Sequence, residues 1–349
     1  MLLTLLSFIL VFSLFAFVHE LGHFVAGRAC GIKVLEFSIG FGPRFFKTKR
    51  GGVIYSLRLL PLGAFVKFAG LDRPEDPAED IPENDPASFR NKPIWARIAT
   101  VLAGPLMNFI AAVVIFAVVF IAIGVPATMI KDVEPGRPAA AAGMLPGDRI
   151  VEVAGRPARG IGEVRERIMS SPGREIMVVV ERDGRRVPLR ITPERDPSTG
   201  SGLIGVTLQE VWGPAPVRES LAYAWSFTRS VASGLVRALA RMATGRMKPD
   251  VAGPIGIAQM VGQTARLGLT NLLFLTAVLN VNLGILNLLP IPILDGGWII
   301  MLLFEAIRRR PLTESQETLA RLIGLAVIGL IILFATASDI ARLSSGLRG

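Results

Sequence analysis

Long apolar stretches separated by polar segments dominate the chain. Four of them, residues 2–24, 98–125, 269–304 and 319–337, are long enough to cross a bilayer as helices, which takes about 20 residues each. The third exceeds one straight crossing and contains Pro290 and Pro292, which break the helical hydrogen-bond ladder. The pattern predicts a polytopic α-helical membrane protein with four transmembrane helices. The first stretch lacks a charged leader region, so we expect a retained helix rather than a signal peptide.

The segment between the first two apolar stretches has strand character. Residues 53–60 and 64–68 flank a turn signal at residues 61–63, after a turn-rich segment at residues 37–43. This pattern predicts a β-hairpin. Its apolar composition favours a membrane-associated hairpin that dips towards the candidate metal site described below; a small soluble β-element is the alternative. Residues 71–92 are acidic and proline-rich, which predicts an exposed linker.

Residues 131–193 have the composition of a water-soluble domain. We expect strands at residues 149–153, 176–182 and 187–191, a helix at residues 162–169, and a hairpin turn at Asp183-Gly184. This order resembles a PDZ domain, an α+β module that binds extended peptides or terminal carboxylates.

A helix with one basic face is expected at residues 217–243, either on the bilayer surface or packed on the soluble domain. The resulting division has four parts: an N-terminal membrane part (1–125), a PDZ-like domain (126–212), an amphipathic linker region (213–268) and a C-terminal membrane part (269–349).

The net charge of +10 changes the picture little, because Lys and Arg lie mostly between the apolar stretches rather than in one basic tract. Membrane topology therefore explains the charge better than nucleic-acid binding does. The positive-inside rule places residues 28–97 and Arg308-Arg309-Arg310 on the cytoplasmic side, and the PDZ-like domain and both termini outside. The single cysteine, Cys30, excludes an intramolecular disulfide.

The candidate chemistry lies within the apolar stretches. His19 and His23, the only two histidines, flank Glu20 in the first. Residues four apart share a helix face, so both imidazoles can bind one metal ion, and Glu20 can accept a proton from water activated there. Asp295 is the only ionisable residue between Arg266 and Glu305 and needs a partner in lipid. The predicted topology brings it to the depth of the histidines. The alternatives are a chance motif match and a helix cap at Asp295. In the second stretch, Asn108 is expected to hydrogen-bond within the bundle.

Together these motifs resemble the site-2 protease family of intramembrane zinc metalloproteases, in particular its bacterial sigma-factor-regulating branch. The resemblance implies one Zn²⁺ per chain, held by His19, His23 and Asp295, with Glu20 as the general base. It also implies substrate-binding residues, with Asn287 holding substrate backbone and the hairpin offering an edge strand: Asn287, Tyr55, Leu57, Leu59 and Gly63. The sequence departs from many relatives at Trp298, where they carry His, and in having one PDZ-like domain where the best-known branch members have two.

The function implied by this resemblance is cleavage of transmembrane segments in single-pass membrane proteins. Examples are regulated proteolysis of anti-sigma factors and clearance of remnant signal peptides. The expected location is the bacterial inner membrane, with the active site towards the cytoplasm and the PDZ-like domain on the periplasmic side, where it binds a peptide or protein ligand. The main rival is a non-catalytic membrane adaptor that binds partners through the PDZ-like domain. A metal transporter or sensor is a second rival, although repeated halves are not apparent.

Overall fold

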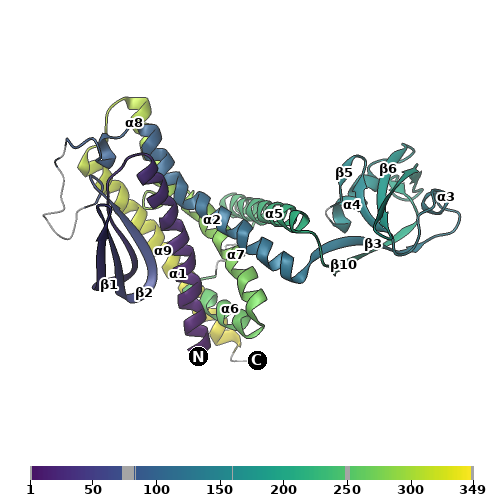
Figure 1. The fold of residues 1–349 in the computed structure, drawn as a ribbon, viewed down its shortest axis with the longest axis horizontal. Coiled ribbons are helices and arrows are strands. Elements are labelled where there is room, and N and C mark those ends of the chain that lie inside the picture. The colour runs from purple at the N-terminus through teal and green to yellow at the C-terminus, as the bar shows by residue number, and fades with distance from the viewer. Residues whose placement is uncertain (1, 73–81, 83, 159, 248–251, 347–349) are drawn as a thin grey trace. The chain divides into compact units, whose positions relative to one another are not determined.

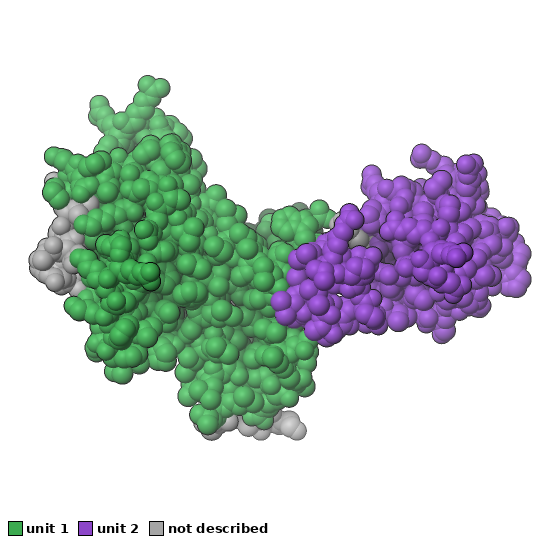
Figure 2. Space-filling view, in the orientation of Figure 1, with its two compact units in different colours: residues 1–116, 225–349 green, residues 117–224 purple. Residues whose placement is uncertain are grey.

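The computed structural model describes residues 2–72, 82, 84–158, 160–247 and 252–346. They form two compact units, residues 1–116 with 225–349 and residues 117–224, coloured separately in Figure 2. The second unit extends beyond the predicted 126–212 domain at both ends, since it includes the last turns of one long helix and the first turns of another.

Helices form most of the first unit (Figure 1). In the described part of the chain four helices are long and apolar enough to cross a membrane, as predicted. An apolar segment in a bilayer folds as a helix because the helix satisfies all its backbone polar groups internally. The helices that belong wholly or partly to this unit are α1 (Leu2–Ala29), α2 (Ile94–Ile123), α5 (Val217–Ala243), α6 (Pro254–Arg266), α7 (Leu269–Asn287), α8 (Asp295–Arg308) and α9 (Glu314–Gly346), with a short 3₁₀ turn, η2 (Phe89–Asn91).

The third apolar stretch is divided as predicted. Helix α7 ends at Asn287 and α8 begins at Asp295, so residues 288–294, which contain both prolines, are not helical. The tight start of α8 depends on Gly296 and Gly297, since a Cβ at either position would lie 2.2 Å from a carbonyl oxygen of the connecting segment. The break therefore presents Asp295 at a helix N-terminus inside an apolar region.

The hairpin is present beside α1, but its turn differs from the predicted one. Strands β1 (Val34–Arg50) and β2 (Val53–Phe68) are antiparallel, and the chain reverses at Gly51 and Gly52, whose φ angles are 57° and 78°. The predicted turn at residues 61–63 is a bend within β2, where Gly63 has φ of 79°. The prediction of the turn was wrong because two successive glycines, which tolerate positive φ at no steric cost, outcompete the Pro-Leu-Gly signal.

The two long strands curl so that one segment of β1 is paired on both sides. Residues 36–39 pair with residues 64–67 and also with residues 54–57, while residues 44–50 pair with residues 53–58. In the described ladder, residues 64–68 therefore have strand partners on one side only. This free edge is the part of the hairpin that reaches the site described below.

The second unit contains a small sheet with the strand order β10-β3-β4-β6-β7, and β5 pairs with β4. Its strands and helices, which include two further short strands, are β3 (Val125–Val133), α3 (Pro138–Ala141), β4 (Arg149–Val153), β5 (Arg156–Pro157), α4 (Ile161–Met169), β6 (Ile176–Arg182), β7 (Arg185–Ile191), β8 (Glu194–Arg195), β9 (Gly202–Leu203) and β10 (Val206–Gly213). Alternating apolar residues of β6 pack with Ile150 and Val153 of β4 and with α4 in one core. The predicted strands and helix are confirmed within two residues, and this unit is the PDZ-like α+β insert.

Candidate metal centre

Helix α1 brings two imidazoles and a carboxylate together. His19 and His23 lie one turn apart, both are buried, and their Nε2 atoms are 3.1 Å apart. One ligand atom from each histidine and one from Glu20 lie within 4.8 Å of one another, close enough to hold one metal ion. The spacing of four residues on one helix produces this cluster directly.

Asp295 joins the cluster from the start of α8. Its Oδ2 atom lies 3.0 Å from His19 Nε2, and its Oδ1 atom lies 3.5 Å from His23 Nε2. Oδ2 is buried and makes no hydrogen bond within the described part of the chain. A buried carboxylate oxygen without a hydrogen bond is costly unless a cation compensates it. Two imidazole nitrogens and one carboxylate oxygen are also the donor set that catalytic zinc sites use.

A backbone carbonyl of α2 fixes the tautomer of His23. The Nδ1 atom of His23 lies 2.9 Å from the carbonyl oxygen of Thr100, which can only accept a hydrogen bond. Nδ1 therefore carries the proton, and the Nε2 lone pair is left for a metal. Histidine ligands of metals are commonly oriented in this way.

Asn108, also on α2, does the same for His19. Its side-chain amide lies 3.1 Å from His19 Nδ1, and its Oδ1 atom is buried without a partner among the described residues. Rotating the amide by half a turn exchanges its oxygen and nitrogen, so that Oδ1 accepts a hydrogen bond from Nδ1–H. That assignment satisfies the orphaned oxygen and leaves His19 Nε2 unprotonated, facing His23 and Asp295.

Gly104 provides the space in which the two rings meet. A Cβ at this position would lie 2.4 Å from both Cε1 and Nε2 of His23 and 2.9 Å from Cε1 of His19. Gly22 has a similar role on the opposite helix, where a Cβ would lie 2.3 Å from the carbonyl oxygen of Ala103. The two glycines allow α1 and α2 to approach closely. The residues present thus fit a tetrahedral metal such as zinc in their donors, their proton positions and the space around them.

The free edge of the hairpin contacts this centre. The backbone N–H of Val66 donates to Oε2 of Glu20 over 3.1 Å, and the N–H of Phe68 donates to Oδ2 of Asp72 over 3.0 Å. Two outward-facing donors of the edge are therefore occupied by carboxylates. The cavity that contains the centre measures about 290 Å³. It is lined by His19, Glu20, His23, Val66, Phe68, Leu71, Asp72, Phe89, Thr100, Val101, Asn287, Ile293, Leu294, Asp295 and Trp298.

The remaining residues expected at the site divide into two groups. Asn287, the last residue of α7, has Nδ2 3.4 Å from His19 Nδ1 and lines the cavity. Tyr55 and Leu57 line a different cavity, between the hairpin and α1. Leu59 is exposed, and Gly63 lies against the ring of Phe41. Of the hairpin, Val66 and Phe68 reach the metal centre, whereas these four residues do not line its cavity.

Sequence reasoning missed three contributions to the centre. The carbonyl of Thr100 and the amide of Asn108 orient the histidines, and Gly104 accommodates them. The sequence offers one signal, the Gly104-Pro105 pair with Asn108 in the middle of an apolar stretch. By itself it predicts close helix packing at Gly104 and a hydrogen bond of Asn108 within the bundle, not contact with the metal ligands. Cys30, half-buried and packed beside the core of the hairpin, is not part of the cluster.

Comparison with known proteins agrees with this geometry. Residues 7–331 match peptidase family M50. The "Putative zinc metalloprotease R01501" of Rhizobium meliloti (strain 1021) is 37% identical over 366 residues, which cover 97% of this chain and 96% of that protein. The "Regulator of sigma-W protease RasP" of Bacillus subtilis (strain 168) is 31% identical over 416 residues, covering 97% of this chain and 99% of that protein.

A solved structure, the PDZ domain of an SdrC-like protein of Listeria monocytogenes, aligns with 23% of this chain and 85% of its own length at 22% identity, with a TM-score of 0.22. At that score the likeness adds nothing to what the strands of the insert show. The match to the family covers most of the chain and includes His19, Glu20, His23 and Asp295. The chain belongs to peptidase family M50 and is a multi-pass membrane zinc metalloprotease with a PDZ-like insert.

Proposed function

We propose that the protein is an intramembrane endopeptidase that cleaves the transmembrane segments of single-pass membrane proteins. The observation that carries the proposal is the meeting of His19, His23 and Asp295, with Glu20 beside them. The two histidines and Glu20 lie on α1, which is apolar enough to cross a bilayer, and Asp295 follows the apolar helix α7 after a short break. Ionisable groups are expensive at such positions and are retained for function. An adaptor would need none of them.

In this proposal His19, His23 and Asp295 hold one zinc ion per chain, which when bound supplies Lewis-acid polarisation of the scissile carbonyl and a water of lowered pKa. Glu20 accepts the proton of the attacking water and delivers it to the leaving amine. Thr100 and Asn108 keep the ring protons of the histidines on Nδ1, away from the reacting atoms. Asn287, beside His19, donates to the substrate backbone.

The substrate is held in extended form along the free edge of the hairpin. A peptide bond in a helix is shielded, whereas an added strand exposes it and satisfies its backbone groups through the edge. Residues 64–68 offer this edge because, among the described residues, no strand pairs with them on the side of Glu20. A substrate strand that pairs with Val66 would displace Glu20 from the Val66 N–H and release the base for catalysis.

The PDZ-like domain is proposed to bind a peptide or protein ligand, such as the terminus of a substrate trimmed outside the membrane. The active site faces the cytoplasmic side of the bacterial inner membrane and the PDZ-like domain faces the periplasm, in keeping with the arginines at residues 28–97 and 308–310. Anti-sigma factors and remnant signal peptides are the substrate classes that fit this arrangement.

The test is cleavage of a single-pass model substrate by the full chain in vesicles. Glu20→Gln keeps the size of the side chain and removes the base, so we expect the rate to fall by at least about 100-fold, with zinc still bound. The matched control is Glu210→Gln, at an exposed carboxylate of the insert, which should leave the rate unchanged. Cleavage by Glu20→Gln at the wild-type rate would refute the mechanism, and full cellular function without Glu20 would favour the adaptor.

A further inference from the structure

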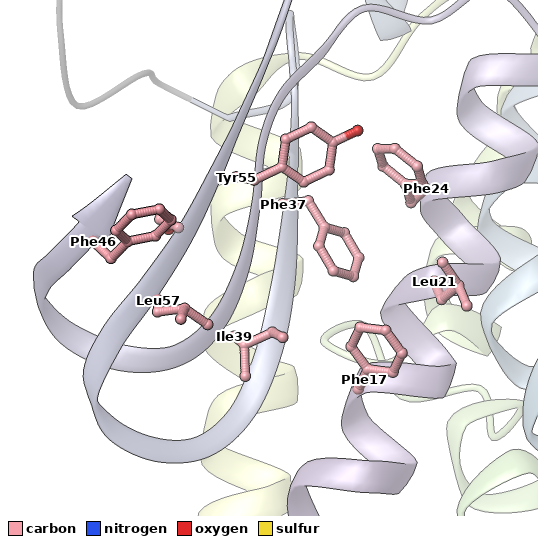
Figure 3. Close-up of a pocket in the computed structure, with 9 residues that line it drawn as sticks. Phe17, Leu21, Phe24, Phe37, Ile39, Phe46, Tyr55 and Leu57 are labelled. Atoms are coloured by element: carbon pink, nitrogen blue, oxygen red, sulfur yellow. The ribbon is translucent and has the colours of Figure 1, made fainter. Parts of the chain in front are cut away.

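A second cavity, separate from the metal centre, lies between α1 and the hairpin. It measures about 330 Å³, at the lower end of the range for ligand pockets, about 300–1,000 Å³. Figure 3 shows aromatic and aliphatic side chains from both elements facing each other across it. We call this cavity the slot; it is lined by Phe17, Leu21, Phe24, Phe37, Ile39, Phe46, Tyr55, Ser56 and Leu57.

The slot is on the other face of α1 from the metal centre. Phe17, Leu21 and Phe24 are spaced four and three residues apart, which places them on one stripe of the helix. His19 and His23 occupy a different stripe, and the slot shares no lining residue with the metal cavity. A substrate residue next to the scissile bond would therefore lie outside the slot. Binding of the substrate at the metal centre does not explain why the slot exists.

A basic cavity lies next to the slot. The basic cavity measures about 540 Å³ and is lined by Arg28, Thr48, Arg50, Gly51 and Tyr55. It shares Tyr55 with the slot. In Figure 3 the Tyr55 hydroxyl points towards the end of the slot where Phe24 lies. Arg28 also belongs to both regions, since its guanidinium lies 5.8 Å from the centre of the Phe24 ring.

Among the described residues, no carboxylate forms an ion pair with the arginines of the basic cavity. These arginines, Arg28 and Arg50, are both exposed. The Tyr55 hydroxyl has no hydrogen-bond partner among the described residues either. Arg28 is in the last turn of α1 and Arg50 ends β1. Two arginines and a tyrosine therefore line a space next to an apolar slot.

We propose that the slot and the basic cavity together bind one anionic phospholipid. One acyl chain lies in the slot between α1 and the hairpin, and the phosphate headgroup is held by Arg28, Arg50 and the Tyr55 hydroxyl. Guanidinium groups suit phosphate because their planar donors match its oxygens, and basic residues at a membrane surface attract anionic lipid. The bound lipid fills the space between the hairpin and α1 and braces the hairpin against the helix that contains Glu20.

The experiment is photo-crosslinking of the full chain in phosphatidylcholine vesicles that contain a trace of lipid with a photoreactive acyl chain. Two probes are compared, phosphatidylglycerol and phosphatidylcholine, and labelled peptides are identified by mass spectrometry. We expect phosphatidylglycerol to label peptides of residues 17–24 and 37–57 at saturable occupancy, and phosphatidylcholine to label them at least fivefold less. Inorganic phosphate should not compete, because the acyl chain contributes to binding.

Two kinds of variant separate the contribution of the lipid headgroup to binding from that of the acyl chain. Arg28→Gln and Arg50→Gln should each weaken phosphatidylglycerol labelling about fivefold, as expected for one basic residue near an anionic surface. Arg310→Gln, at an exposed arginine outside both cavities, is the matched control. Leu21→Trp should fill the slot and abolish labelling, whereas Leu10→Trp, at an exposed position of the same helix, should not.

Zinc content serves as the check of folding for every variant. The proposal is overturned if both lipids label the slot equally, if the two arginine variants label as wild type does, or if a substrate peptide rather than lipid occupies the slot. None of these readouts requires proteolysis, so failure of the proposed function and failure of the lipid site are distinguishable.

Discussion

Replacing Gly104 by alanine tests how closely the two central helices must approach. The added Cβ would lie 2.4 Å from Cε1 and Nε2 of His23, whereas ordinary contact begins at 3.4 Å, so the ring must retreat by 3.4 − 2.4 = 1.0 Å. Ligand distances in metal sites are held within about 0.2 Å. The displacement is several times larger than that tolerance, so His23 cannot stay in place as a ligand.

The expected result is a loss of zinc affinity of at least about 100-fold, the upper end of what disturbing residues around a metal ligand produces. The effect on folding should be small by comparison. Overpacking costs about 1–3 kcal/mol, and alanine recovers about 1 kcal/mol of helix propensity relative to glycine. A large change in affinity with a small change in unfolding temperature is therefore the signature of this contact.

The assay is zinc competition against a chromophoric chelator, with thermal unfolding measured on the same preparation in detergent. Gly329→Ala is the matched control, because Gly329 also lies in a membrane-spanning helix but has no atom within 4 Å of an added Cβ. The control should bind zinc as wild type does. Zinc affinity of Gly104→Ala within twofold of wild type would refute the reasoning.

Three further predictions concern other contacts. Asn108→Ala should weaken zinc binding about 10–100-fold, because it removes the side-chain acceptor of the His19 Nδ1 proton. The same competition assay measures this, and unchanged zinc affinity would contradict the role of the Asn108 amide. Glu305→Gln should lower the free energy of unfolding by about 3 kcal/mol, because it leaves the buried Arg97 without the carboxylate 2.7 Å away. Thermal unfolding measures this loss, and a loss under 1 kcal/mol would contradict a stabilising role of this ion pair. In the insert, burial would raise the pKa of Asp148, but hydrogen bonds from Arg182 and a backbone N–H outweigh it and hold the pKa below its ordinary value. A lowered folded-state pKa gives stability that is present above the unfolded-state value of about 3.9 and is lost as pH falls through the folded-state value. Hydrogen exchange of β4 and β6 in the full chain should accelerate over that range in wild type, and Asp148→Asn should abolish this dependence.

Local sequence patterns predicted the features that depend on short spacings. Two histidines four residues apart must share a helix face, and two prolines within an apolar stretch must interrupt the helix. The structure confirms both, with His19 and His23 in contact and α7 separated from α8. The approach of Asp295 to the histidines is expected from the predicted membrane topology, in which the first and third apolar stretches cross the bilayer in the same direction.

The features that sequence did not predict depend on contacts between distant segments. No periodicity relates α1 to α2, so the hydrogen bond from His23 to Thr100 and the space at Gly104 emerge only when the helices pack. The hairpin shows the same limit. Residues 61–63 contain a good turn signal, yet the register is set by Gly51-Gly52 and by the buried pairing of residues 36–39 on both sides. Tyr55 consequently lines the slot rather than the metal cavity.

The most direct test of the account is X-ray absorption at the zinc edge on the full chain loaded with one equivalent of zinc, in wild type and in Asp295→Ala. We predict two imidazoles and oxygen donors, with no sulfur, and weaker binding with altered oxygen coordination in Asp295→Ala. A sulfur ligand at about 2.3 Å, or a coordination unchanged by the loss of Asp295, would contradict the account.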